Sequence, residues 1–155
     1  MNLTRTIYLD NNATTAVVPE VIAAMQPYFT HEFGNPSSLH HFGVKAERGL
    51  RTARHAIAQH FHSKDHEIIF TSGGSESISL GIKGAAYALK RKGMHIITAE
   101  TEHEAVLATV NQLTQAGFTV SFAAVDSYGR VSPESVYALM TDETILVAID
   151  RKSVV

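Results

Sequence analysis

The sequence predicts an α/β fold, a mostly parallel sheet with helices on both faces. Short apolar runs alternate with segments whose apolar residues recur at helical spacing, and clusters of turn-forming residues separate the two kinds of segment. The run at residues 145–149 is apolar throughout, as is typical of a strand that is covered on both faces. With 155 residues, of which 45% are hydrophobic and 18% charged, the chain corresponds to about one globular domain.

The first part of the chain contains two predicted helices. A short apolar run at residues 7–9 begins the alternation, and Pro19 suits the first position of a helix that continues through Met25. The turn-rich segment 33–38 ends that helix. Across residues 41–61 apolar side chains recur every three or four positions, which predicts a long amphipathic helix with one apolar face: Ala46, Leu50, Ala53, Ile57 and Phe61.

The remainder of the chain alternates strands with helices. Strands are expected at the apolar runs 68–70, 95–98, 120–124 and 145–149. Helices are expected around residues 78–89, 106–113 and 133–140. Gly93 and Gly117 are expected to end the first two of these helices, and Ser132 to cap the third with Pro133 at its first position.

Composition excludes several classes of function. The net charge is -2 without a basic block, which argues against nucleic acid as the main partner. The sequence has no run of about 18 apolar residues and no secretory leader, so we expect no membrane partner and a cytoplasmic location. It has no cysteine, which excludes disulfides, thiolate metal sites and a cysteine nucleophile within these residues.

The segment 71–77, Thr-Ser-Gly-Gly-Ser-Glu-Ser, is a candidate phosphate-binding turn. It follows a predicted strand and leads into a helix, where free N–H groups and hydroxyls can bind an anion. Gly73 and Gly74 would let the backbone approach a ligand closely. No lysine follows the glycines, so this is not a Walker loop, and an ordinary cap and turn is the alternative.

His103 is the second candidate, because it follows the strand at 95–98 and would face the same edge of the sheet. An imidazole there could stack on a planar ligand or exchange a proton, and the alternative is that it caps a helix. Among the other histidines, His60, His62 and His66 have the spacing closest to that of metal ligands. They lack an acidic or thiolate partner, which favours a solvated surface over a metal site.

Four motifs occur in order: residues 8–15 (YLDNNATT), 33–38 (FGNPSS), 71–77 (TSGGSES) and 101–107 (TEHEAVL). They resemble those of the cysteine desulfurases that use pyridoxal phosphate, members of the class V aminotransferase family, and above all the nitrogen-fixation and iron–sulfur-cluster types. The resemblance covers residues 8 to about 149. It implies that the chain is the amino-terminal part of a fold-type-I large domain.

The resemblance also implies chemistry and partners. Such an enzyme is a homodimer that uses pyridoxal 5'-phosphate to convert L-cysteine to L-alanine. It passes the sulfur to an enzyme cysteine as a persulfide and then to a scaffold protein for iron–sulfur cluster assembly.

By position, Gly74 and Ser75 match the pair that binds the cofactor phosphate, where most relatives have Ala-Thr. His103 matches the histidine that stacks on the pyridine ring and assists proton transfer, and it is therefore the expected catalytic residue. Residues 11–15 and 35–38 resemble segments that line the site or the dimer interface.

The resemblance also shows what the chain lacks. The family's covalent lysine lies in a Ser-x-His-Lys context, which none of the chain's lysines has: Lys45, Lys64, Lys83, Lys90, Lys92 and Lys152. The carboxylate that pairs with the pyridinium nitrogen is expected on a later strand. We therefore expect a truncated, inactive fragment of a desulfurase. The alternatives are a selenocysteine lyase or another class V member, or a short binding or dimerisation module without catalysis.

Three segments are predicted from these arguments. Residues 1–18 form an amino-terminal segment, residues 19–149 a partial cofactor-binding domain, and residues 150–155 a tail that is not native to the protein. The match to the family ends at Asp150, and one frame of a widely used sequencing adapter encodes the hexapeptide that starts there, followed by a stop.

Overall fold

The computed structural model describes residues 7–11 and 13–150. The chain divides into two compact units, Met1–Ile69 and Phe70–Val155. The predictions that concern Asn12 and residues 151–155 of the predicted tail 150–155, Lys152 included, lie outside the described residues. Within them, no helix is long and apolar enough to cross a membrane.

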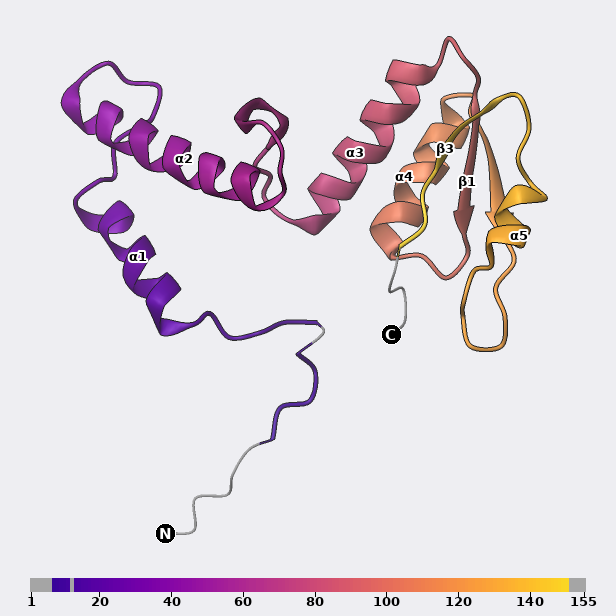
Figure 1. The fold of residues 1–155 in the computed structure, drawn as a ribbon, viewed down its shortest axis with the longest axis horizontal. Helices are drawn as coiled ribbons and strands as arrows, with labels where there is room; N and C mark the ends of the chain where they lie inside the picture. Colours follow the sequence, from indigo (N-terminus) through magenta and orange to yellow (C-terminus); the bar gives the residue numbers. More distant parts are fainter. Residues whose placement is uncertain (1–6, 12, 151–155) are drawn as a thin grey trace. The chain divides into compact units, whose positions relative to one another are not determined.

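The first unit contains the two predicted helices (Figure 1), α1 at Pro19–Thr30 and α2 at His41–His60. Pro19 occupies the start of α1 as predicted. The two helices approach closely where Tyr28 lies against Gly49. A Cβ at position 49 would collide with the tyrosine ring, so this contact requires glycine. The apolar run at residues 7–9 forms no strand, and Leu9 is 89% exposed.

The predicted apolar face of α2 is only partly covered. Ala46 is buried, but Leu50, Ala53 and Ile57 are exposed, and Phe61 is 70% exposed. The predicted long helix is therefore confirmed, while most of its apolar face is exposed within the described residues. Periodicity identifies the face of a helix that can be buried, but it does not identify what covers that face.

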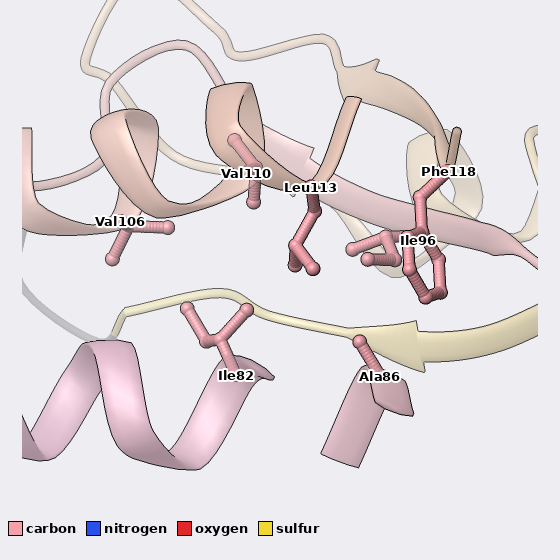
Figure 2. Packing of buried hydrophobic residues seen from close by; sticks show 7 residues of the cluster. All are labelled: Ile82, Ala86, Ile96, Val106, Val110, Leu113 and Phe118. Carbon is pink, nitrogen blue, oxygen red and sulfur yellow. The ribbon is translucent and has the colours of Figure 1, made fainter. Parts of the chain in front are cut away.

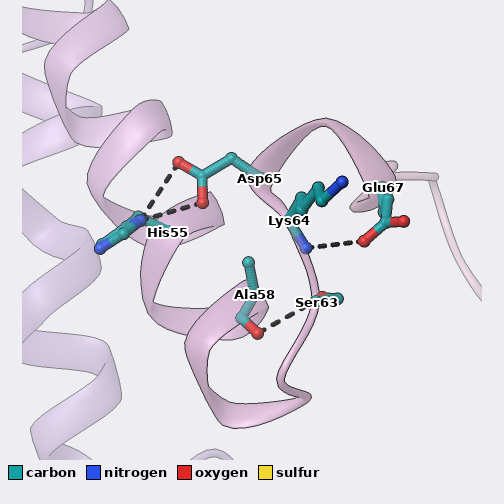
Figure 3. Close-up of polar contacts among 6 residues, drawn as sticks. All are labelled: His55, Ala58, Ser63, Lys64, Asp65 and Glu67. Carbon is teal, nitrogen blue, oxygen red and sulfur yellow. Dashed lines mark hydrogen bonds and ion pairs between the residues drawn. The ribbon is translucent and has the colours of Figure 1, made fainter.

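The carboxyl end of α2 closes with a reversal of the chain at His62, which has a φ of 51°. The His62 N–H donates to the Gln59 carbonyl, and the Ser63 N–H donates to the Ala58 carbonyl, 2.9 Å away. This pair of bonds is a Schellman motif. Figure 3 shows the following segment, where His55 Nδ1 lies 2.9 Å from Asp65 Oδ1.

The second unit is built on a three-stranded parallel sheet (Figure 1). Its strands are β1 at His95–Ala99, β2 at Thr119–Ala123 and β3 at Thr144–Val147, in the order β2-β1-β3. Both pairings are parallel, which confirms the predicted kind of sheet. Every residue of β1 is buried, whereas β2 and β3 are partly exposed. The full burial predicted for the run at 145–149 is wrong in this structure, because β3 lies at an edge of the described sheet.

The strand predicted at residues 68–70 is absent from the described sheet. A 3-10 turn, η1 at Asp65–Glu67, precedes it, and the boundary between the two units falls between Ile69 and Phe70. The Ile68 carbonyl accepts a hydrogen bond from the Arg54 guanidinium on α2. That carbonyl therefore bonds to a side chain and not to the backbone of a neighbouring strand, and residues 68–70 belong to none of the strands of the described sheet.

The helices of the second unit are α3 at Gly74–Leu89, α4 at Glu104–Gln115 and α5 at Pro133–Tyr137. Figure 2 shows that side chains from α3, α4 and β1 meet in one apolar cluster. Its buried members are Ile82, Ala86, Ile96, Val106, Val110, Leu113 and Phe118. Among these, all three predicted residues of the α4 stripe are buried, which confirms that face. This packing fixes the start of α3 and the start of α4 within one unit.

The helix ends agree with the sequence at two of three positions. Gly117 follows α4 with a φ of 95°, as predicted for a helix-ending glycine, and the Ser132 hydroxyl accepts a hydrogen bond from the Ser135 N–H at the start of α5.

The prediction for Gly93 is wrong, because α3 already ends at Leu89. Gly93 is instead required for space, since a Cβ there would overlap the Glu143 carbonyl. Helix α5 is shorter than predicted, because tighter turns carry the chain from Tyr137 to Met140.

Candidate functional site

A cavity of about 380 Å³ lies in the second unit beside the carboxyl end of β1. Its walls come from the first half of α3, from the turn between β1 and α4 together with the first turn of α4, and from the segment after β3. The lining residues are Ser77, Ile78, Gly81, Ile82, Glu102, His103, Val106, Ala148, Ile149 and Asp150. The wall is mostly apolar with a few polar groups, as is typical of small-molecule sites at the carboxyl edge of a parallel sheet.

His103 lines this cavity and also caps α4. Its Nδ1 accepts a hydrogen bond from the Ala105 N–H, 3.0 Å away. Both roles considered for this residue from the sequence are therefore compatible, because one ring nitrogen serves the helix while the ring borders the cavity. Since Nδ1 accepts, the neutral ring must carry its proton on Nε2.

The segment 71–77 comprises a turn and the first residues of α3, and its side chains bond to one another. The Glu76 carboxylate accepts hydrogen bonds from the Ser72 N–H at 2.6 Å and from the Ser72 hydroxyl at 2.7 Å. These bonds, first that of the hydroxyl and then that of the N–H, hold the pKa of Glu76 below its ordinary value. The Thr71 and Ser77 hydroxyls lie 2.6 Å apart and close the other side of the turn.

Gly74 and Ser75 are the first two residues of α3, one turn before the part of the helix that lines the cavity. The N–H groups of a first helical turn have no partner within the helix, so they are available to an anion. No atom lies within 4 Å of the position that a Cβ would take at Gly73 or Gly74, so the space at this helix end is open. The donors and the open space fit a phosphate group.

The structure brings a further residue into the cavity wall, Glu102. Its side chain is only 7% exposed, and its Oε1 accepts a hydrogen bond from the Asp150 N–H at 2.9 Å. In the sequence, Glu102 stands out only as part of the motif around His103. An acidic residue beside a histidine gives no signal of burial, and the partner lies 48 positions further along the chain.

The remaining predicted segments make local contacts in the first unit. Asn35 Oδ1 accepts from the Ser37 N–H at 2.9 Å, and the Thr15 hydroxyl donates to the Asn11 carbonyl at 3.0 Å.

Of the three histidines whose spacing resembles that of metal ligands, His62 lies at the carboxyl end of α2. Among the described residues, no group of three or more His, Cys, Asp or Glu side chains is arranged to hold a metal.

Comparison with known proteins identifies the family to which this fold belongs. Residues 7–155 match the aminotransferase class-V family model, and the chain belongs to that family. It is 46% identical over 147 residues to the cysteine desulfurase IscS of Clostridium botulinum (strain Hall), an alignment that covers 95% of this chain and 37% of the relative. The cysteine desulfurase IscS of Methanosarcina thermophila is also 46% identical, over 94% of this chain and 36% of its own length. The chain thus spans little more than a third of these relatives.

Solved structures agree with this assignment. A NifS-like protein superposes with a TM-score of 0.86 at 38% identity, covering 92% of this chain and 39% of its own. SspA in complex with cysteine gives a TM-score of 0.85 at 35% identity, covering 93% of this chain and 42% of its own. The predicted fold class, part of the large domain of a fold-type-I enzyme, is confirmed.

Proposed function

We propose that this chain forms the phosphate-binding and ring-stacking part of the cofactor site of a cysteine desulfurase. The observation that carries the proposal is the cavity of the second unit, which has His103 in its wall and the open amino terminus of α3 beside it. The similarity to cysteine desulfurases over more than nine-tenths of the chain supports L-cysteine as the substrate of the whole enzyme.

Pyridoxal 5'-phosphate would be held at two places. The backbone N–H groups of Gly74 and Ser75, with the Ser75 hydroxyl, would bind its phosphate at the start of α3. His103 would lie against its ring. When bound, the cofactor supplies an electron-withdrawing ring system, and the protein supplies its orientation.

His103 is the proposed catalytic residue of this segment. The Ala105 N–H occupies Nδ1, so the proton that the neutral ring can exchange is the one on Nε2. The apolar side chains Ile78, Ile82 and Val106 would exclude water from the same cavity. The chain therefore contributes binding, ring orientation and one proton-transfer group.

The rest of the chemistry would depend on residues that the 155-residue sequence does not contain. No lysine lies in a Ser-x-His-Lys context, and the chain has no cysteine to accept sulfur. We infer that the chain alone releases no sulfide from cysteine. Homodimer formation, transfer of sulfur to a scaffold protein and a cytoplasmic location belong to the same proposal for the whole enzyme.

Equilibrium dialysis of the chain against pyridoxal phosphate tests this proposal. Ser75→Ala should weaken binding about 10- to 100-fold, because a neutral donor to a charged phosphate contributes about 1.5 to 3 kcal/mol. The matched control is Ser79→Ala, which removes a hydroxyl from the same helix beyond its first turn and should leave affinity unchanged. Equal affinity for the wild type and Ser75→Ala would contradict the assignment of the phosphate site.

A further inference from the structure

Glu102 is a buried carboxylate that the proposed chemistry leaves without a role. It stands directly before His103 in the turn that joins β1 to α4, and both residues line the cavity. Of residues 100–104, Glu102 alone is buried. Carboxylates are rarely buried without hydrogen bonds, because removing them from water is costly. Glu102 therefore anchors a turn whose other residues are more exposed.

The anchor joins this turn to the backbone after β3. The Ala148 N–H donates to the Ile97 carbonyl at 2.8 Å, and the Thr98 hydroxyl donates to the Ala148 carbonyl at 2.8 Å. Two residues further on, the Asp150 N–H donates to Glu102 Oε1 at 2.9 Å. The contacts between β1 and β3 thus continue past the end of β3 to the turn. Because the donor at position 150 is a backbone N–H, this contact is independent of the side chain there.

We propose that Glu102 is a positioning residue for His103. By tying the turn to the end of β3, its carboxylate fixes the backbone from which the imidazole enters the cavity wall and keeps Nδ1 in reach of the Ala105 N–H. The proposal rests on the proposed function only for what the ring then does to a bound cofactor.

Four variants of the 155-residue chain test the positioning role. Glu102→Ala removes the acceptor, and Glu102→Asp keeps the charge on a side chain one methylene shorter. Glu102→Gln keeps an acceptor oxygen at the same reach. Glu100→Ala is the matched control, since it removes an exposed carboxylate from the same turn. The readouts are amide hydrogen exchange at residues 105 and 150 and the tautomer of the His103 ring by ¹⁵N NMR.

We expect exchange at residue 150 to accelerate about 10- to 100-fold in the alanine and aspartate variants, as for loss of a hydrogen bond to a buried charge. In both variants exchange at residue 105 should also accelerate, and the His103 ring should become a mixture of tautomers. The glutamine and Glu100→Ala variants should behave as the wild type. If Glu102→Ala fails to fold, the contrast between aspartate and glutamine carries the test.

Two results would overturn the proposal. Unchanged exchange at residue 105 with an unchanged His103 tautomer, despite faster exchange at residue 150, would mean that Glu102 holds only the end of β3. A glutamine variant that behaves like the aspartate variant would show that the hydrogen bond from the Asp150 N–H to side chain 102 does not position His103. Dialysis against pyridoxal phosphate separates the two proposals, because a wild-type chain that fails to bind it would refute the proposed function while the exchange and tautomer results stand.

Discussion

His62 and Gly117 occupy the same position at the ends of two different helices. Each lies one residue beyond the helix cap, with a φ of 51° at His62 and 95° at Gly117, and each is followed by a residue whose N–H donates back to the last turn. Glycine adopts this left-handed conformation without strain, whereas a side chain with a Cβ does so at a cost. The helix end after α2 therefore carries strain that the end after α4 lacks.

Replacing His62 with glycine should raise the free energy of unfolding of the first unit by about 1 kcal/mol, because the left-handed conformation costs about 1 to 2 kcal/mol in a residue with a side chain. The reciprocal change, Gly117→Ala, should lower the stability of the second unit by a similar amount. A Cβ at position 117 meets only the Met94 side chain at an ordinary contact distance, so its cost is conformational. Urea unfolding of both variants provides the measurement, and a destabilised His62→Gly would contradict the account.

Gly93→Ala should destabilise the second unit by about 1 to 3 kcal/mol, the usual cost of forcing extra atoms into a packed site. The new Cβ would overlap the Glu143 backbone just before β3, so one of the two segments must move. Gly74→Ala is the matched control. Its Cβ enters open space at the start of α3, where alanine is the better helix former, and stability should stay equal or rise. Equal losses of stability in the two variants would show that Gly93 is not required for its small size.

The Glu76 carboxylate should make stability depend on pH in the acid range. Its pKa is lowered in the folded state, first by the Ser72 hydroxyl and then by the Ser72 N–H. A group with a lowered pKa contributes stability that is fully present above its ordinary value of 4.5 and is lost as the pH falls through the folded-state pKa.

Ser72→Ala removes the largest cause of that shift. The difference in unfolding free energy between wild type and Ser72→Ala should therefore be larger at pH 7 than at pH 3, as measured by urea titration at each pH. Ser79→Ala, on the helix that carries Glu76, should show a difference from wild type that does not change with pH. A Ser72→Ala difference that grows on acidification would have the wrong sign.

The sequence predicted the second unit better than the first, for physical reasons. Val106, Val110 and Leu113 repeat at helical spacing and are all buried, because α4 packs against both α3 and β2 within one unit. The stripe of α2 repeats as regularly, yet Phe61 is mostly exposed. Local periodicity reports the structure of a helix, whereas burial depends on which other segments cover it. The prediction of a strand at 68–70 was wrong for a related reason, because a strand needs hydrogen bonds to another segment that the local sequence does not identify.

The candidate site was predictable where it lies in short motifs. The turn at 71–77 and His103 each follow local signals, and the structure has both in the second unit. Glu102 was missed because its role depends on a backbone group after β3, which no local pattern reveals. The two roles weighed for His103 proved compatible, because a histidine has two ring nitrogens and the helix uses only one of them.

The buried ring of His95 should couple the three strands energetically. Its Nδ1 lies 2.8 Å from the Thr144 hydroxyl on β3, and its Nε2 lies 2.9 Å from the Ser121 hydroxyl on β2. His95→Leu keeps a side chain of similar volume but removes the ring nitrogens that bond to both hydroxyls. It should therefore lower the free energy of unfolding by about 1 to 3 kcal/mol. Ser121→Ala should cost about 1 kcal/mol in the wild type, because it removes the partner of Nε2, and much less in the His95→Leu background.

Urea unfolding of the two single variants and the double variant closes this cycle, and a coupling energy of about 0.5 to 1.5 kcal/mol is expected. Thr141→Ala is the control, because the Thr141 hydroxyl lies 3.4 Å from the Thr144 hydroxyl whereas the His95 ring bonds to Thr144 itself. Its effect should be nearly additive with that of His95→Leu. Strictly additive effects of His95→Leu and Ser121→Ala would mean that the ring fills space between the strands without binding them together.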